Sequence, residues 1–146
     1  MSQPTQVDPR GLRFVAGITS VVLAISLVTP VRVAVVLLGL QAIVFAVGAF
    51  GSLQRAPYSL FFAKVVRPRI GAPAGLEDSR PPRFAQLVGF LFVVVALAGF
   101  LSGATVIGYV ATAFALIAAL LNASVGFCLG CEMYLALRRF TPAKAA

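Results

Sequence analysis

The sequence predicts an all-α integral membrane protein: a four-helix bundle built from two helical hairpins, joined by a cytoplasmic loop with an interfacial helix. Three observations predict this fold. Of the 146 residues, 60% are hydrophobic and only 11% are charged, too few to cover a water-soluble domain of this size. Four apolar runs approach or exceed the roughly 20 residues that a helix needs to cross a bilayer. The basic residues lie almost wholly outside these runs, so we expect a single transmembrane domain over residues 1–146.

The first hairpin comprises spans over residues 12–29 and 33–52. The turn Thr29-Pro30-Val31-Arg32 separates them, and so short a turn places the two helices antiparallel and side by side. The first span is similar to the apolar part of a signal peptide. No small-residue cleavage pattern follows it, however, and the second span begins at once, so we expect it to remain as an anchor.

The second hairpin comprises spans over residues 84–102 and 105–125, which Ser102-Gly103-Ala104 separates. Between the hairpins lies a loop over residues 53–83. Its residues 57–66 are apolar but too few to span, and they include Lys64, so we expect an interfacial helix along the membrane surface. Residues 67–83 contain four prolines and two glycines, which predicts an irregular, water-exposed chain.

The basic residues predict the orientation. All but Arg32, which lies in the turn of the first hairpin, fall near the N-terminus, in the central loop or after the last span. They are Arg10, Arg13, Arg55, Lys64, Arg67, Arg69, Arg80, Arg83, Arg138, Arg139 and Lys144. The positive-inside rule then places both termini and the central loop in the cytoplasm. The net charge of +8 faces anionic lipid, and because no basic face carries interleaved aromatic residues, we expect no nucleic-acid partner.

The two hairpins are weakly similar at an offset of about seventy-two residues. Gly17 then matches Gly89, Pro9 matches Pro81, and residues 21–24 match residues 93–96. A duplication explains these matches, and so does a shared apolar alphabet. Under a duplication, the interfacial segment after the second helix corresponds to the segment after the fourth, which holds both cysteines of the chain, so a site there would exist in one half only.

The two cysteines, Cys128 and Cys131, have C-x-x-C spacing where the last apolar run meets the basic tail, residues 126–146. The spacing puts both on one helix face or, if the helix breaks at Gly126, both in the first turn of a new helix. In the reducing cytoplasm we expect free thiols rather than a permanent disulfide. Cys128 is the candidate nucleophile and Cys131 the resolving thiol. Arg138 and Arg139 favour a thiolate, and Glu132, a candidate binding residue, opposes it.

Other interpretations of the cysteines remain open. Two cysteines in so apolar a chain also fit inert side chains packed between helices. Two thiolates are half of a tetrahedral metal site, and because the chain has no histidine, we expect no metal and no cofactor. No acidic or basic residue lies deep in a span, which argues against a proton-coupled pump or a charged ion channel. No phosphate-binding loop or nucleophile elbow occurs either.

Three further residues are candidates for binding. Gln86 lies one turn inside the third span, at the depth of Cys128, where it would hold a thiolate, a persulfide or a small sulfur oxyanion. The alternative role for Gln86 is a hydrogen bond to a neighbouring helix. Arg13 and Arg83 suffice as topology determinants, and they would also bind an anion such as thiosulfate next to the thiols.

Two motifs resemble the paired signatures of the DUF4395 family of small bacterial membrane proteins. They are Phe84-Ala85-Gln86-x-x-Gly89 and Phe127-Cys128-Leu129-Gly130-Cys131-x-x-Tyr134, and Val7-Asp8-Pro9-Arg10-x-x-Arg13 fits as well. The resemblance implies a multi-pass protein of the bacterial inner (plasma) membrane. The family has no known function, but its members resemble components found beside thioredoxin-like proteins and rhodanese-type sulfurtransferases, which implies thiol or sulfur chemistry.

The function we expect is a membrane thiol-redox or sulfur-relay protein that uses the cysteine pair at the cytoplasmic face. A thioredoxin-like protein or a sulfurtransferase would be the partner. The alternatives are a non-catalytic membrane anchor or assembly subunit and a small permease for a sulfur compound. Because four short helices bury little surface by themselves, we also expect a homo-oligomer or a place in a membrane complex.

Overall fold

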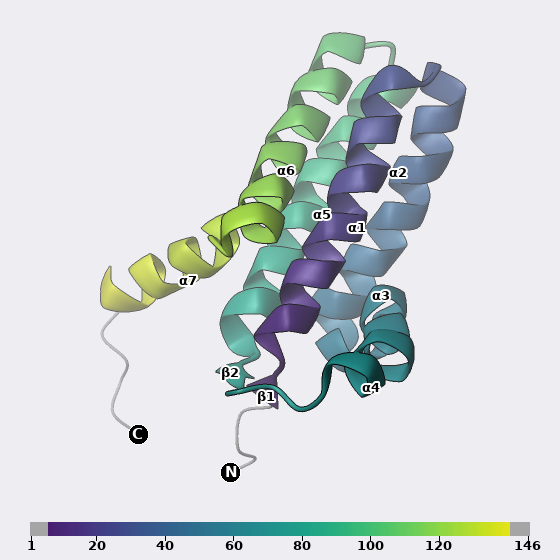
Figure 1. The fold of residues 1–146 in the computed structure, drawn as a ribbon. Coiled ribbons are helices and arrows are strands. Elements are labelled where there is room, and N and C mark those ends of the chain that lie inside the picture. The colour runs from purple at the N-terminus through teal and green to yellow at the C-terminus, as the bar shows by residue number, and fades with distance from the viewer. Residues whose placement is uncertain (1–5, 141–146) are drawn as a thin grey trace.

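Four long helices form an antiparallel bundle in the computed structural model, which describes residues 6–140 (Figure 1). The helices are α1 (Pro9–Val28), α2 (Val31–Ala46, continued by a π-helical turn η1, Val47–Gly51), α5 (Arg80–Leu101) and α6 (Thr105–Val125). Each is long and apolar enough to cross a membrane. The predicted fold class, an all-α membrane bundle, is therefore confirmed.

The core of the bundle lies where all four helices meet. Leu23, Leu38, Val93 and Ala96 are fully buried there. Many large apolar side chains on the outer faces are exposed, Val36, Ile43 and Phe114 among others, which suits a surface that faces lipid rather than water. In the second hairpin α5 and α6 approach closely at Gly99, which has no side chain to keep them apart. A Cβ added at Gly99 would lie only 2.7 Å from the backbone nitrogen of Gly108.

Both hairpins begin earlier than the hydropathy pattern predicts. Residues 80–83, placed in the central loop by the sequence, form the first turn of α5. Pro81 and Pro82 are tolerated there because a helix makes no use of its first backbone N–H groups. α1 likewise begins at Pro9, so Arg10 lies inside the helix and not ahead of it as the predicted span over residues 12–29 implied.

The interfacial segment is helical for longer than predicted. It runs through α3 (Pro57–Phe61), a π-helical turn η3 (Phe62–Val66) and α4 (Arg67–Ile70), although the sequence predicts an irregular chain over residues 67–70. In the wide turn the N–H of Arg67 donates to the carbonyl of Phe62, five residues back. Pro68 follows in the first turn of α4, where a backbone N–H has no partner within the helix. Gly71, at φ 80°, ends the helix.

A second surface helix, α7 (Leu129–Phe140), lies in the predicted cysteine segment and basic tail, and it is the new helix that a break at Gly126 allows. It leaves the bundle at an angle, on the same end as α3, α4 and the two-residue strands β1 (Gln6–Val7) and β2 (Glu77–Asp78), which pair antiparallel (Figure 1). We call this the basic end, because α1 and α5 begin there with their arginines. Lys144 and the rest of the predicted tail lie outside the described residues.

The two halves share a sequence motif and its contacts at the basic end. Asp8-Pro9-Arg10-Gly11-Leu12-Arg13-Phe14 and Asp78-Ser79-Arg80-Pro81-Pro82-Arg83-Phe84 both read D-x-R-x-x-R-F. Asp8 accepts from the N–H of Arg10, and Asp78 from that of Arg80, at 2.9 Å in both cases. The offset is 70 residues here, two fewer than in the comparison of residue types along the spans. The repeat is thus visible in contacts as well as in residue types.

Candidate thiol site at the basic end

A glycine turn leads from the bundle into the cysteine segment. α6 ends at Val125, and Gly126 follows with φ 73°, in the left-handed region that favours glycine. Its N–H donates to the carbonyl of Asn122 at 3.1 Å, and the N–H of Phe127 donates to that of Leu121 at 3.3 Å. The sequence allows one continuous helix or a break at Gly126, and the structure has the break.

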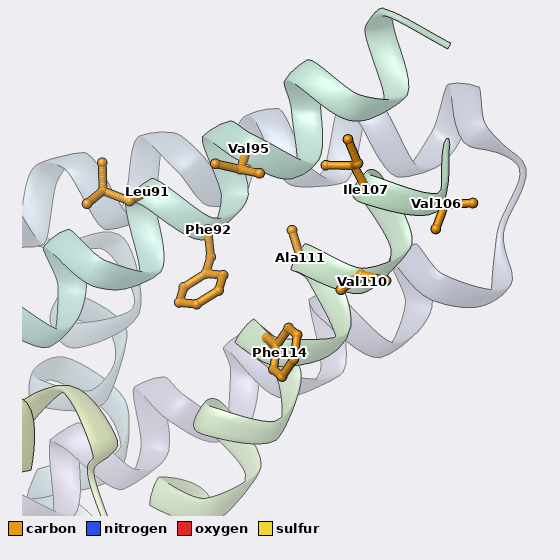
Figure 2. A pocket seen from close by; sticks show the side chains of 8 residues that line it. All are labelled: Leu91, Phe92, Val95, Val106, Ile107, Val110, Ala111 and Phe114. Carbon is orange, nitrogen blue, oxygen red and sulfur yellow. The ribbon is translucent and has the colours of Figure 1, made fainter. Parts of the chain in front are cut away.

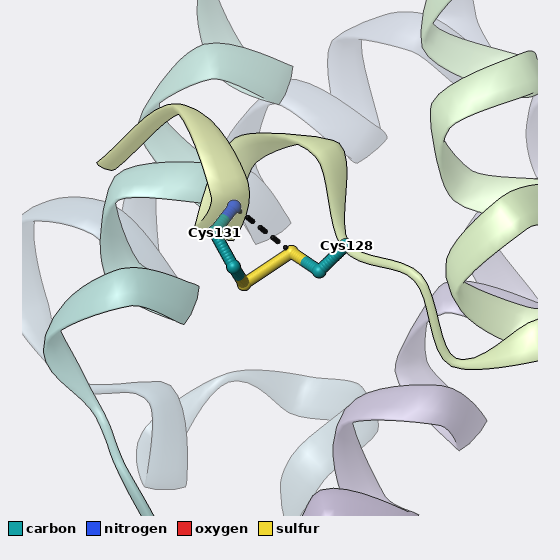
Figure 3. The surroundings of a disulfide bond; sticks show 2 residues. All are labelled: Cys128 and Cys131. Atoms are coloured by element: carbon teal, nitrogen blue, oxygen red, sulfur yellow. Dashed lines mark hydrogen bonds between the residues drawn. A yellow bond between two sulfur atoms is a disulfide. The ribbon is translucent and has the colours of Figure 1, made fainter. Parts of the chain in front are cut away.

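The two cysteines open α7. Cys128 immediately precedes the helix and Cys131 lies in its first turn, with their Cα atoms 5.1 Å apart. The backbone N–H of Cys131 donates to Sγ of Cys128 at 3.2 Å (Figure 3). The N–H of Glu132 donates to the carbonyl of Cys128 at 3.0 Å. The Cys128 sulfur therefore caps the positive end of the helix, an environment that stabilises negative charge.

A disulfide joins Cys128 to Cys131 in the structure, whereas free thiols are expected from the reducing compartment. Spacing and the helix start explain why the bond closes, since side chains three residues apart in a first turn point the same way. Both cysteines are half-buried. A soluble thiol could therefore reach them without unfolding of the bundle.

Close contacts hold α7 against α5. Gly130 is buried, and a Cβ added there would lie 2.5 Å from the Cα of Ala85. One turn further on, the Tyr134 ring lies 5.8 Å from that of Phe84, and the Arg138 guanidinium lies 5.9 Å from the centre of the Tyr134 ring. The disulfide is thus carried by a helix whose first turn touches the start of α5.

Arg13 reaches the same region from α1. Its guanidinium donates to the carbonyls of Ser124 at 2.9 Å and Ala123 at 3.3 Å, the last acceptors of α6. A basic group at a helix C-terminus satisfies carbonyls that have no partner within the helix. Arg13 therefore supports the turn that leads to Cys128, a role beyond the topology and anion binding that the sequence suggests.

The other predicted binding residues lie elsewhere. Gln86 packs on η1, where its side-chain atoms lie 3.0–3.2 Å from a Cβ added at Gly48, and within residues 6–140 it has no hydrogen bond to either cysteine. Arg83 donates to the carbonyl of Ala49, in the middle of η1, at 3.1 Å. Glu132 is exposed in the first turn of α7, next to Cys131. The structure thus groups Arg13 and Glu132 with the cysteine segment, and it turns Arg83 and Gln86 toward α2 and η1.

Gly130, Phe84 and Tyr134 position the site, although sequence reasoning did not identify them as site residues. Each lies within one of the two motifs over residues 84–89 and 127–134. Gly130 and Tyr134 are about one helical turn apart, so a helix predicted over residues 129–140 would have placed both on the same helix face. The proline-free, apolar and basic pattern of residues 129–140 was the available signal.

An apolar hollow lies far along α6 from the cysteines. It has a volume of about 490 Å³ and is lined by apolar residues of α5 and α6, among them Phe92, Val95, Val110 and Phe114 (Figure 2). It offers no polar group that could recognise a charged sulfur compound. Within the described part of the chain, no three His, Cys, Asp or Glu side chains are grouped so that they could hold a metal ion.

Comparison with known proteins supports the resemblance seen in the motifs. No curated protein and no solved structure matches the chain. A family model described as a domain of unknown function, DUF4395, matches residues 7–139, which include both D-x-R-x-x-R-F motifs and both cysteines. The chain therefore belongs to the DUF4395 family.

Proposed function

We propose that the protein is a membrane thiol-redox or sulfur-relay protein in which Cys128 and Cys131 cycle between a dithiol and a disulfide. The contact that carries this proposal is the bond from the Cys131 N–H to the Cys128 sulfur at 3.2 Å, at the start of a twelve-residue helix. It favours the thiolate at Cys128, the form that attacks disulfides. Half-burial leaves both sulfurs within reach of a partner.

The redox cycle has two exchange steps. The Cys128 thiolate attacks one sulfur of a substrate disulfide, which forms a mixed disulfide and releases the other substrate sulfur as a thiolate. The Cys131 thiol then attacks the Cys128 sulfur, which closes the internal disulfide and releases the second substrate thiol with the proton of Cys131. Two electrons pass to the substrate, and a thioredoxin-like dithiol returns the pair to its reduced form.

The same pair fits transfer of sulfane sulfur. The Cys128 thiolate accepts the outer sulfur of a donor persulfide, such as that of a rhodanese-type sulfurtransferase, and the donor leaves as a thiolate. Attack by the Cys131 thiol on the Cys128 sulfur then forms the disulfide and releases hydrosulfide. In both reactions Cys128 forms the bond to the substrate sulfur, and Cys131 then attacks the Cys128 sulfur to release the product.

We place the site on the cytoplasmic side of the bacterial inner membrane. The distribution of arginines supports this orientation, because ten of the described basic residues lie at the basic end or in its loop and tail and Arg32 lies at the other end. A soluble partner would then approach α7 from the cytoplasm. Assembly with further copies or with other membrane subunits stays a prediction.

Single serine variants test the proposal. We would treat reduced protein in inverted membrane vesicles with a chromogenic aromatic disulfide and follow release of the coloured thiolate over pH. Cys131→Ser is expected to accumulate a mixed disulfide at Cys128, with a reaction midpoint below the ordinary thiol pKa of about 8.5. Cys128→Ser, the matched control, removes the sulfur that accepts the N–H bond. It leaves only the Cys131 thiol, to which no N–H donates within residues 6–140, and is expected to react more slowly.

The opposite outcome supports packing cysteines in a non-catalytic anchor. In that case both serine variants would react equally slowly in vesicles, and labelling would begin only when detergent unfolds the bundle. Double replacement of the cysteines would then leave binding of a soluble partner unchanged.

A further inference from the structure

A small polar cavity lies at the basic end between the start of α5 and the end of η1. Its volume is about 100 Å³. The polar side chains in its wall are those of Ser52, Gln54, Ser79 and Arg83. We call it the Arg83 pocket. None of the residues that line it is acidic.

Ser79 points to a ligand in this pocket. It is 5% exposed and immediately precedes α5, yet its hydroxyl does not cap the helix and has no hydrogen-bond partner within residues 6–140. Among those residues every fully enclosed polar side-chain atom has a partner, so the Ser79 hydroxyl keeps its small exposure toward the cavity. Hydroxyls in so buried a position are normally hydrogen-bonded. The Ser79 hydroxyl therefore leaves a donor and an acceptor for a bound molecule.

Arg83 supplies a positive charge with no ion-pair partner within residues 6–140. The one hydrogen bond of its guanidinium among the described residues goes to the neutral carbonyl of Ala49. The ion pairs of the described residues join Arg10 to Asp8 and Arg80 to Asp78. A guanidinium has five N–H donors, so most of those on Arg83 remain for a ligand.

Ser52 adds a second hydroxyl. It accepts from the N–H of Gln54 at 3.2 Å, so its own O–H is left to donate. The nearest acid along the chain is Asp78, next to Ser79, and both of its oxygens accept from the Arg80 side chain, at 2.7 to 3.2 Å. The pocket thus presents one cation and two hydroxyls, while the neighbouring carboxylate is paired elsewhere.

We propose that the Arg83 pocket binds a small tetrahedral oxyanion, held by the Arg83 guanidinium and by the hydroxyls of Ser79 and Ser52. Such an anion accepts several hydrogen bonds at once and balances the unpaired charge. Its source is either a free inorganic anion or the phosphate of a lipid headgroup, because the pocket lies at the end of the bundle.

This site is separate from the thiol site. Arg83 faces η1, whereas Ala85, two residues further along α5, touches Gly130 of α7. Two helical residues differ by about 200° around the axis, so the two sites lie on opposite sides of the same turn. The proposal therefore does not depend on the chemistry of the cysteines.

The test uses the full chain in nanodiscs of phosphatidylcholine, with its melting temperature measured in sulfate, in phosphate and in chloride at matched ionic strength. Sulfate or phosphate is expected to raise the melting temperature of the wild type. Ser79→Ala is expected to weaken the apparent affinity roughly tenfold, since one hydrogen bond to a charged group is lost, and Ser79→Thr is expected to restore it. Arg83→Gln is expected to abolish the effect.

Arg13→Gln is the matched control. It removes the bond from the Arg13 guanidinium to the carbonyls of α6, which corresponds to the bond from Arg83 to Ala49, but it leaves the Arg83 pocket intact. We expect sulfate and phosphate to raise the melting temperature of this variant as much as that of the wild type. To identify the source, nanodiscs containing phosphatidic acid are compared with no added anion. Stabilisation by that lipid alone assigns a headgroup, and stabilisation by sulfate alone assigns a free anion. The proposal is overturned if neither the anions nor the lipid raises the melting temperature of the wild type. It is also overturned if they stabilise Ser79→Ala and Arg83→Gln as much as the wild type.

Discussion

The two halves of the bundle start alike and end differently. In each half the D-x-R-x-x-R-F motif begins the first helix, and its second arginine reaches across to the other hairpin. Arg13 of α1 binds carbonyls at the end of α6, and Arg83 of α5 binds one within η1, the π-helical turn that continues α2. Each first helix therefore ties down the last turn of the opposite hairpin, an exchange that holds the two halves together.

The phenylalanine of each motif supports a surface helix. Phe14 stacks on Phe61 of α3, with ring centres 5.9 Å apart, and Phe84 packs on Tyr134 of α7 at 5.8 Å. Beyond this shared support the two surface helices carry different groups. The helix of the first half joins a polar network, and the helix of the second half holds the cysteines.

The polar network of the first half is buried. Tyr58 of α3 donates to Oε1 of Gln41 at 2.9 Å, and Nε2 of Gln41 donates to Thr19 at 3.3 Å, with Gln41 fully buried. These two hydrogen bonds connect α3, α2 and α1. The surface helix thus joins a buried polar network in the first half and carries the cysteine pair in the second half.

The glycines that seat the two surface helices should give the greatest contrast between the halves. Gly130→Ala would push a Cβ to within 2.5 Å of the Ala85 backbone, which cannot move aside. Such overpacking costs about 1–3 kcal/mol. We expect a lower melting temperature in detergent and faster reduction of the Cys128–Cys131 disulfide, measured by mass shift after alkylation.

Gly11→Ala is the matched change in the first half. Its Cβ would meet the Phe62 ring at 3.1 Å, and a side chain can yield by that amount. We expect a much smaller loss of stability and an unchanged rate of disulfide reduction. Equal effects of the two substitutions would contradict the view that Gly130 seats the site.

The polar network should give the next greatest contrast. Tyr58→Phe leaves Oε1 of the buried Gln41 without its donor, and an unsatisfied buried acceptor costs about 1–3 kcal/mol. Tyr134→Phe removes a hydroxyl that makes no hydrogen bond within residues 6–140 and keeps the ring against Phe84. We expect thermal unfolding to separate the two variants clearly. If Tyr134→Phe loses as much stability as Tyr58→Phe, the tyrosine hydroxyl matters equally in both surface helices and the predicted contrast is wrong.

A dependence on pH should be weaker than either of these effects. The Arg10 side chain bonded to Asp8 holds the pKa of that carboxyl below its usual range, and Arg80 does the same for the pKa of Asp78. A lowered folded pKa gives stability that is fully present above the unfolded value of about 3.9 and is lost as the pH falls through the folded value. We expect Asp8→Asn to remove part of the loss of stability seen below about pH 4.

Asp78→Asn should change this acid profile less. The Asp78 side chain is 35% exposed against 8% for Asp8, and ion pairs in water contribute little because solvent screens them. Melting temperatures of both variants between pH 3 and pH 7 would compare the halves directly. A larger change in Asp78→Asn would reverse the predicted order.

Local patterns in the sequence were enough to predict the spans, the sidedness of the charges and the proximity of the cysteines. A run of about 20 apolar residues must satisfy its backbone as a helix in lipid, and a C-x-x-C spacing brings two sulfurs together in one helical turn. Matches between the two halves were visible as well, although the comparison of residue types placed them at an offset of about seventy-two residues.

The surroundings of the cysteines depend instead on how the helices pack. Arg13 lies 110 and 111 residues from the carbonyls that it binds, and Gly130 meets Ala85 across two helices, contacts that no periodicity encodes. Depth along a span suggested that Gln86 faces Cys128, but depth does not specify the direction around a helix. That direction was set by which helices pack together, so Gln86 lies on Gly48 and the cysteine segment rests on the adjacent face of α5.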